Sequence, residues 1–114
     1  MARRLIMMLV LILNMLILTT AAQAVVVINE VMPTPSAGDD WIELYNDDMV
    51  DLSLDGWRID DSSSTIRSFV AGDVVAAGGY MIVEVGSRLN RDGDSLHLWD
   101  ADDWGVDKLS YGDV

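Results

Sequence analysis

The sequence contains no cysteine, and this absence restricts how the fold can be held together. Small domains in oxidising compartments commonly use disulfides as cross-links. In this chain core packing, a bound ion or a partner must do that work instead. Zinc is disfavoured too, because there is no thiolate and His97 is the only histidine.

Positive charge is also scarce, since 7 lysines and arginines stand against 19 aspartates and glutamates, for a net charge of −12. Without residues 1–24 the net charge becomes −14, because that segment holds Arg3 and Arg4 and no acid. A surface of this sign repels phosphate backbones and anionic lipid headgroups, so we expect no nucleic-acid binding through the domain. The other basic residues are Arg58, Arg67, Arg88, Arg91 and Lys108.

The N-terminus carries the one long apolar run. Arg3 and Arg4 precede the apolar residues 5–18, and Ala22-Gln23-Ala24 follows as a cleavage signal. This order is typical of a signal peptide. The run is shorter than the ~20 residues that a spanning helix needs. We therefore predict a helical signal peptide over residues 1–24, cleaved after Ala24, and a secreted or cell-surface location; an uncleaved leader would instead anchor the chain in a membrane.

After residue 24 no helical periodicity appears, and short apolar or alternating runs recur between turn-forming residues. Alternation places Leu96 and Leu98 on one face of such a run. We predict strands over residues 25–31, 41–46, 56–60, 65–70, 80–85, 95–99 and 106–111. Seven short strands predict one all-β domain over residues 25–114, an immunoglobulin-like β-sandwich.

Five segments in this order support a more specific interpretation: VVINEVMPTP, DDWIELYN, VDLSLDGWRIDD, AAGGYMIVEV and GDSLHLWDADDWGVDKLSYG. Together they resemble the lamin-tail domain family, an immunoglobulin-like module of nuclear lamins that also occurs in exported prokaryotic proteins. Members of that family usually continue past the segment like LSYG with one more strand. The resemblance therefore implies either a domain without its last strand, whose open sheet edge can accept a partner's strand, or a chain that continues beyond residue 114.

Carboxylates cluster first in GDDWIELYNDD, residues 38–48. The four aspartates of this stretch flank a predicted strand, and we interpret them as solvated turn residues rather than as a metal or catalytic cluster. Glu43 lies within the strand beside two aromatic residues. We expect it to be half-buried and paired with Arg58 or Arg67.

A second acidic cluster begins at Asp100 and resembles the start of a calcium loop, with acids at positions one and three and Gly105 at position six. Trp104 at position five and Tyr111 at position twelve do not provide the oxygen ligands of such a loop. We therefore expect a hairpin turn and neither a metal nor another cofactor. The alternative is a non-helical calcium site formed by Asp92, Asp94, Asp100, Asp102 and Asp103.

No catalytic or cofactor-binding residue is predicted. His97 alternates with two inward leucines and has no evident partner, and no serine stands in a nucleophile-elbow context. Trp99 and Trp104 of the last hairpin form the candidate binding surface, unless they pack over the edge of the sandwich.

These observations predict a non-catalytic binding or structural module, exported to the cell surface or beyond, with a protein or cell-envelope partner. The resemblance leaves a second interpretation open. Prokaryotic lamin-tail-like domains accompany nucleases and other hydrolases, so the chain can instead be the N-terminal accessory domain of a longer secreted enzyme.

Overall fold

A computed structural model describes residues 26–112, so the predicted signal peptide lies outside the described residues. The described residues form nine strands, and among them no helix is long and apolar enough to cross a membrane. The strands are β1 (Val26–Met32), β2 (Trp41–Asn46), β3 (Leu52–Ser53), β4 (Arg58–Asp60), β5 (Thr65–Ser68), β6 (Val74–Val75), β7 (Tyr80–Glu84), β8 (Gly93–Trp99) and β9 (Gly105–Gly112).

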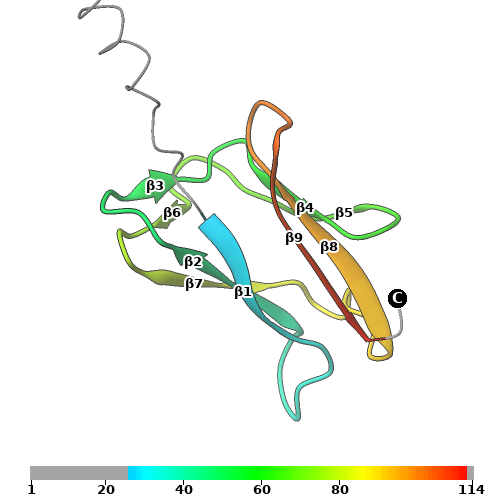
Figure 1. Cartoon of the computed structure of the whole chain (residues 1–114). Helices are drawn as coiled ribbons and strands as arrows, with labels where there is room; N and C mark the ends of the chain where they lie inside the picture. The colour runs from blue at the N-terminus through cyan, green and yellow to red at the C-terminus, as the bar shows by residue number, and fades with distance from the viewer. Residues whose placement is uncertain (1–25, 113–114) are drawn as a thin grey trace, which may run out of the picture.

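The strands form two facing layers (Figure 1). One layer is a three-stranded sheet in the order β1-β2-β7, and the other is a four-stranded sheet in the order β5-β4-β8-β9. The short strands β3 and β6 pair with each other, and every ladder is antiparallel. The predicted immunoglobulin-like β-sandwich is therefore confirmed.

The core lies between the layers and is formed by the inward residues of alternating strands. Ile42 and Leu44 of β2 and Leu96 and Leu98 of β8 are fully buried, as the alternation in the sequence predicts. Burial of each such side chain contributes roughly 1.5–3 kcal/mol. The other buried apolar residues are Val26, Ile28, Leu54, Ile59, Phe69, Val75, Val83, Val85 and Leu89.

The strands β3 and β6 were not predicted from the sequence. Each has only two residues, too few to show the alternation of inward and outward side chains. They are tied to the end of β2 by Asn46, which is fully buried. The Asn46 Nδ2 donates to the carbonyl oxygens of Val50 (2.9 Å) and Val75 (3.0 Å). Its Oδ1 accepts the N–H of Asp48 at 3.0 Å, so every polar atom of this buried amide is used.

One side of the sandwich is closed by a contact between the edge strands of the two layers. Asn29 is an extra residue in the β1-β2 ladder, whose register shifts between Ile28 and Glu30. The Ile28 N–H donates to Oδ2 of Asp107 in β9 at 2.7 Å. The Asp107 side chain of one sheet thus accepts the hydrogen bond of a backbone N–H that the edge strand of the other sheet leaves unpaired.

The β8-β9 hairpin depends on a glycine. Gly112 pairs with Gly93 and has a φ of 70°, in the left-handed region. A Cβ at this position would lie 2.1 Å from the Asp92 carbonyl oxygen. Only glycine fits there without displacing the backbone, which gives a physical reason for the glycine that ends the segment LSYG.

We expect Leu96→Ala to lower the free energy of unfolding by about 2–5 kcal/mol, since it removes a fully buried side chain from the core. Urea denaturation followed by tryptophan fluorescence measures the change. Met49→Ala is the matched control, because Met49 is 93% exposed and should shift stability by less than about 0.5 kcal/mol. Equal effects of the two substitutions would contradict the assignment of the core.

Candidate functional site

The acidic stretch 38–48 does not act as one unit. Asp39 and Asp47 are exposed, as predicted for turn residues, and Asp48 accepts the N–H of Met49 at 2.6 Å. Asp40 departs from the prediction, because only 6% of its surface is exposed. The interpretation of this residue as a solvated turn former is therefore wrong.

Asp40 is buried because its carboxylate holds two loops together. Its Oδ1 accepts the N–H of Thr34 at 2.9 Å, and its Oδ2 accepts the N–H of Leu89 at 3.0 Å. Thr34 has a φ of 50°, a left-handed conformation that is uncommon for a residue with a Cβ. The carboxylate thus fixes the loop after β1 against the loop after β7.

A hollow of about 440 Å³ opens beside this junction. It is lined by Thr34, Pro35, Gly38, Asp39, Asp40, Gly86, Ser87 and Leu89. Both oxygens of its buried carboxylate already accept backbone hydrogen bonds. The hollow therefore forms where the two loops meet, and Asp39 is the exposed charged residue of its lining.

Glu43 is half-buried, as predicted, but its partner is not an arginine. Glu43 Oε1 accepts a hydrogen bond from Asn29 Nδ2 at 2.8 Å. Arg58 and Arg67 lie on β4 and β5, in the opposite sheet. The predicted ion pair is wrong because the sequence does not reveal which sheet each strand joins.

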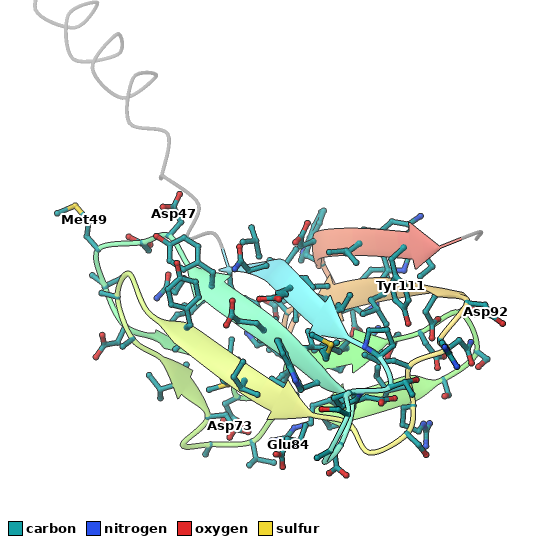
Figure 2. The ribbon with its side chains drawn as sticks, turned by 90° about the horizontal axis from the view of Figure 1, so that it is seen from below. Asp47, Met49, Asp73, Glu84, Asp92 and Tyr111 are labelled. Carbon is teal, nitrogen blue, oxygen red and sulfur yellow. The ribbon has the colours of Figure 1, made fainter. Side chains whose placement is uncertain are left out.

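The aspartates considered for calcium fall at opposite ends of β8. Asp92 precedes this strand, whereas the other cluster begins at Asp100, directly after it. A seven-residue strand spans roughly 20 Å, so one ion cannot bridge the two groups. Figure 2 shows Asp92 at the far end of the sandwich from Met49. Among residues 26–112 no three His, Cys, Asp or Glu residues gather in a way that could hold a metal ion.

Several of these carboxylates instead accept hydrogen bonds from backbone N–H groups of nearby residues. Asp94 is 2% exposed, and its oxygens accept the N–H groups of Asn90 (3.2 Å) and Ser95 (2.9 Å). Asp100 Oδ1 accepts the N–H groups of Asp102 and Trp104, both at 2.9 Å. The second acidic cluster therefore forms the hairpin turn that the sequence predicts.

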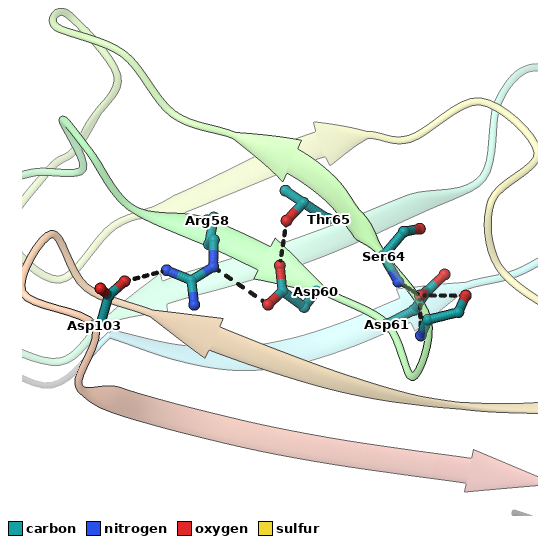
Figure 3. Close-up of polar contacts among 7 residues, drawn as sticks. Arg58, Asp60, Asp61, Ser64, Thr65 and Asp103 are labelled. Atoms are coloured by element: carbon teal, nitrogen blue, oxygen red, sulfur yellow. Dashed lines mark hydrogen bonds and ion pairs between the residues drawn. The ribbon is translucent and has the colours of Figure 1, made fainter.

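Arg58 organises a polar network on the outer face of the β5-β4-β8-β9 sheet (Figure 3). Its guanidinium donates to Asp60 at 3.2 Å and to Asp103, and Asp60 also accepts the hydroxyl of Thr65 at 2.7 Å. The hydrogen bond to Asp103 raises the pKa of Arg58. The network fixes the β8-β9 turn against β4, and one of its parts, Asp103, has a φ of 62°.

Asp61 shapes the turn that follows β4, also visible in Figure 3. Its Oδ1 accepts the N–H groups of Ser63 (2.8 Å) and Ser64 (2.7 Å) and the hydroxyl of Ser63. Burial raises the pKa of Asp61, but these hydrogen bonds lower it by more, so the pKa lies below its ordinary value. The contribution of this turn to stability is present above the ordinary pKa of 3.8 and is lost as the pH falls through the folded value.

The two tryptophans of the candidate binding surface have different surroundings. Trp99 is half-buried beneath the Arg58 guanidinium, which lies 5.2 Å from its ring centroid. Trp104 is 73% exposed at the hairpin tip. The His97 ring lies 5.4 Å from that of Trp99 and, within the described residues, forms no side-chain hydrogen bond with a serine or carboxylate. Trp99 therefore packs on the sheet, and of these two tryptophans only Trp104 offers a free aromatic surface.

A larger exposed surface, which the sequence interpretation missed, covers the outside of the β1-β2-β7 sheet. Tyr80 and Ile82 of β7 expose 62% and 51% of their surfaces. The rings of Tyr45 and Tyr80 lie 4.7 Å apart, tilted by 31°. In Figure 2 this sheet lies in front of the other layer. The signal was present in the alternation of WIELYN and YMIVE, whose outward positions are partly apolar or aromatic.

We call this surface the outer β2-β7 face. Its central residues are Trp41, Glu43 and Tyr45 of β2 and Tyr80, Ile82 and Glu84 of β7. β1 adds Glu30, which stands directly opposite Glu43 in the ladder. Like charges placed directly opposite across two strands are destabilising. The face thus combines exposed aromatic surface with carboxylates that have no basic residue in their ladder positions.

We expect Asp40→Asn to lower the free energy of unfolding by about 1–3 kcal/mol, because the new amide places a donor against a backbone donor. Asp39→Asn is the matched control, since Asp39 is exposed and its neighbour is buried. Urea denaturation of both variants tests the difference. A similar stability for the two would show that the Thr34 and Leu89 contacts contribute nothing.

Tyr111 gives a test that depends on pH. Its hydroxyl donates to the Asn90 carbonyl oxygen at 2.6 Å. Burial, together with the charges of Asp94 and Asp40, raises the pKa of Tyr111 from 10.0 to about 12. Because the pKa of Tyr111 is higher in the folded than in the unfolded chain, the protonated phenol stabilises the fold fully at any pH below the unfolded-state pKa. This stabilisation is lost as the pH rises through the folded-state pKa. Stability should therefore fall between about pH 10 and 12.

Tyr111→Phe should abolish the last phenol ionisation step in an ultraviolet titration and remove part of this high-pH loss of stability. At neutral pH it should cost about 0.5–1.5 kcal/mol, the usual worth of one hydrogen bond. Tyr80→Phe is the control and should leave the last step in place. A last step that persists in Tyr111→Phe would contradict the assignment.

Comparison with known families agrees with this geometry. The family model described as Lamin Tail Domain matches residues 19–113, a range that contains all nine strands. A comparison with curated proteins found no match. Lamin tail domains are immunoglobulin-like structural or binding modules, which fits a sandwich whose most prominent feature is an exposed sheet face. The chain belongs to the lamin tail domain family.

Proposed function

We propose that the chain is an exported, non-catalytic module that binds a protein partner at the cell surface or outside the cell. The observation that carries this proposal is the outer β2-β7 face, where Tyr80 and Ile82 stand half or more exposed beside the ring of Tyr45. Contiguous exposed apolar surface is a mark of interaction sites. A module that binds through a sheet face needs no catalytic residue.

The charge of the domain narrows the class of partner. Glu30, Glu43 and Glu84 lie on or beside the aromatic patch, and the whole chain carries a net charge of −12. Polyanions such as nucleic acids and anionic lipid surfaces would be repelled. A protein with exposed apolar groups and positive charge suits the face better.

Two features favour binding over catalysis. The ring of His97 lies 5.4 Å from that of Trp99, and among residues 26–112 the imidazole has no hydrogen bond to a serine that it could activate. The buried carboxylates of Asp40 and Asp94 have both oxygens engaged by backbone N–H groups. Carboxylates held in this way stabilise loops and are poorly placed for proton transfer.

The N-terminal sequence supports export, since basic residues, an apolar run and small residues at the cleavage site follow in order. Expression of the full chain in a bacterial host should yield a product that begins at Val25 outside the cytoplasm. N-terminal sequencing of the fractionated protein measures this. Leu11→Arg, which interrupts the apolar run, is the matched control and should leave the chain inside.

A wild-type product that remains in the cytoplasm with residues 1–24 intact would overturn the export part of the proposal. A product that is exported but keeps these residues would point instead to an anchored module. Both results would leave the assignment of the binding face untouched, because that assignment depends on residues 26–112 alone.

A further inference from the structure

The outer margin of β7 has backbone groups that no strand uses. The Val85 N–H donates to the Asp40 carbonyl oxygen at 2.9 Å. This bond shows which residue pairs of the β2-β7 ladder are hydrogen-bonded and which are not. Because bonded and non-bonded pairs alternate in an antiparallel ladder, Tyr80, Ile82 and Glu84 direct their N–H and C=O groups away from β2. β7 is the last strand of its sheet, so within residues 26–112 no strand receives them (Figure 1).

Two other sheet edges, those of β1 and β5, are protected in ways that the edge of β7 is not. At the margin of β1 the Ile28 N–H is already bonded to Asp107 of β9. The margin of β5 carries Arg67, whose guanidinium lies 5.5 Å from the ring centroid of the buried Phe69. A charge near the inside of an edge strand opposes the addition of another strand. β7, with the sequence YMIVE, has neither a basic residue nor a proline.

The same three residues of β7 present their side chains on the outer β2-β7 face. A strand laid beside β7 would therefore place alternate side chains next to Tyr80, Ile82 and Glu84. Its other side chains would extend the apolar layer formed by Met81 and Val83, which are half-buried and buried respectively. The geometry thus selects an extended segment whose inward residues are apolar.

Charge selects the outward residues of such a segment. Glu43 and Glu84 flank Ile82 on the face, and Glu30 stands opposite Glu43. The basic residues of the described range lie elsewhere, on β4, β5, β9 and the loop between β7 and β8. Arginine suits this setting best, because it pairs with carboxylates and stacks on aromatic rings such as Tyr80.

We propose that the β7 margin accepts an extended segment of another protein, basic on its outward side and apolar on its inward side, as an added strand. This inference rests on the proposed function as a binding module and specifies its partner. Backbone hydrogen bonds to β7 would provide the binding, and the glutamates would select the basic segment. A second copy of the chain is disfavoured, because its net charge of −12 opposes association.

The test uses the purified chain and a capped peptide of alternating arginine and valine, about nine residues long, which exceeds a common strand length. Fluorescence anisotropy should detect binding at low salt that weakens at about 0.5 M NaCl. A peptide with glutamate in place of arginine should not bind. A peptide N-methylated on alternate residues keeps its charge but cannot pair as a strand on its methylated side, so it should also fail.

Variants locate the binding on β7. Ile82→Lys places a positive charge at the centre of the face and should weaken binding of the arginine peptide at least tenfold. Val74→Lys is the matched control, since Val74 is 44% exposed on β6, which is not part of the β1-β2-β7 sheet, and it should bind as wild type does. The double variant Glu43→Gln, Glu84→Gln should bind about five- to tenfold more weakly through the loss of two exposed charge pairs.

Several outcomes would overturn the inference. Equal binding of the N-methylated peptide would mean charge attraction without strand pairing. Equal effects of Ile82→Lys and Val74→Lys would place the peptide elsewhere, and dimerisation abolished by Ile82→Lys would make a second copy the occupant. If the chain is exported but binds no peptide, only this inference is wrong. If the chain binds the peptide but is not exported, only the proposed location outside the cytoplasm is wrong.

Discussion

The buried side chains of β2 and β8 form the contact on which the rest of the structure depends. Ile42 and Leu44 of one sheet and Leu96 and Leu98 of the other are fully buried in a single apolar core. The chain has no cysteine, so no covalent cross-link supports the two layers. The strands and the loops between them are therefore held in place by noncovalent contacts alone, and the packing of this core is the largest of these.

Aspartate provides much of the remaining support, and this explains part of the acidic composition. Asp40, Asp61, Asp94 and Asp100 each accept backbone N–H groups at the point where a strand ends or a turn begins. Asp107 does the same between the two sheets. Carboxylates suit this role because each offers two oxygens and bonds strongly to donors. Acidity in this domain is thus partly a structural device rather than a sign of a metal site.

The sequence predicted the architecture well where alternation is long enough to read. The strand Trp41–Asn46 has the predicted bounds, and its inward residues are the buried ones. β3 and β6 were missed because two residues show no period. The burial of Asp40 was missed because its partner, the N–H of Leu89, is 49 residues away in the chain. Contacts of this kind arise from tertiary structure and leave no local pattern.

The candidate binding surface was also hard to predict, because it depends on tertiary contacts. Trp99 and Trp104 drew attention as large residues near the chain's last hairpin, yet Arg58 covers the first of them. The outer β2-β7 face is formed by two strands that are distant in sequence, and only their pairing brings Tyr45 against Tyr80.

The glutamates on that face have two physical consequences that agree with each other. An exposed sheet margin without protection invites pairing with any strand, including that of an identical chain. Glu84 lies on this edge strand and Glu43 on the neighbouring strand β2, and their charges repel a second acidic copy while they attract a basic segment. The like-charged pair of Glu30 and Glu43 costs stability in the free domain, and a cationic partner would relieve it. A domain whose apolar sheet edge carries carboxylates can therefore stay monomeric and still bind a basic segment.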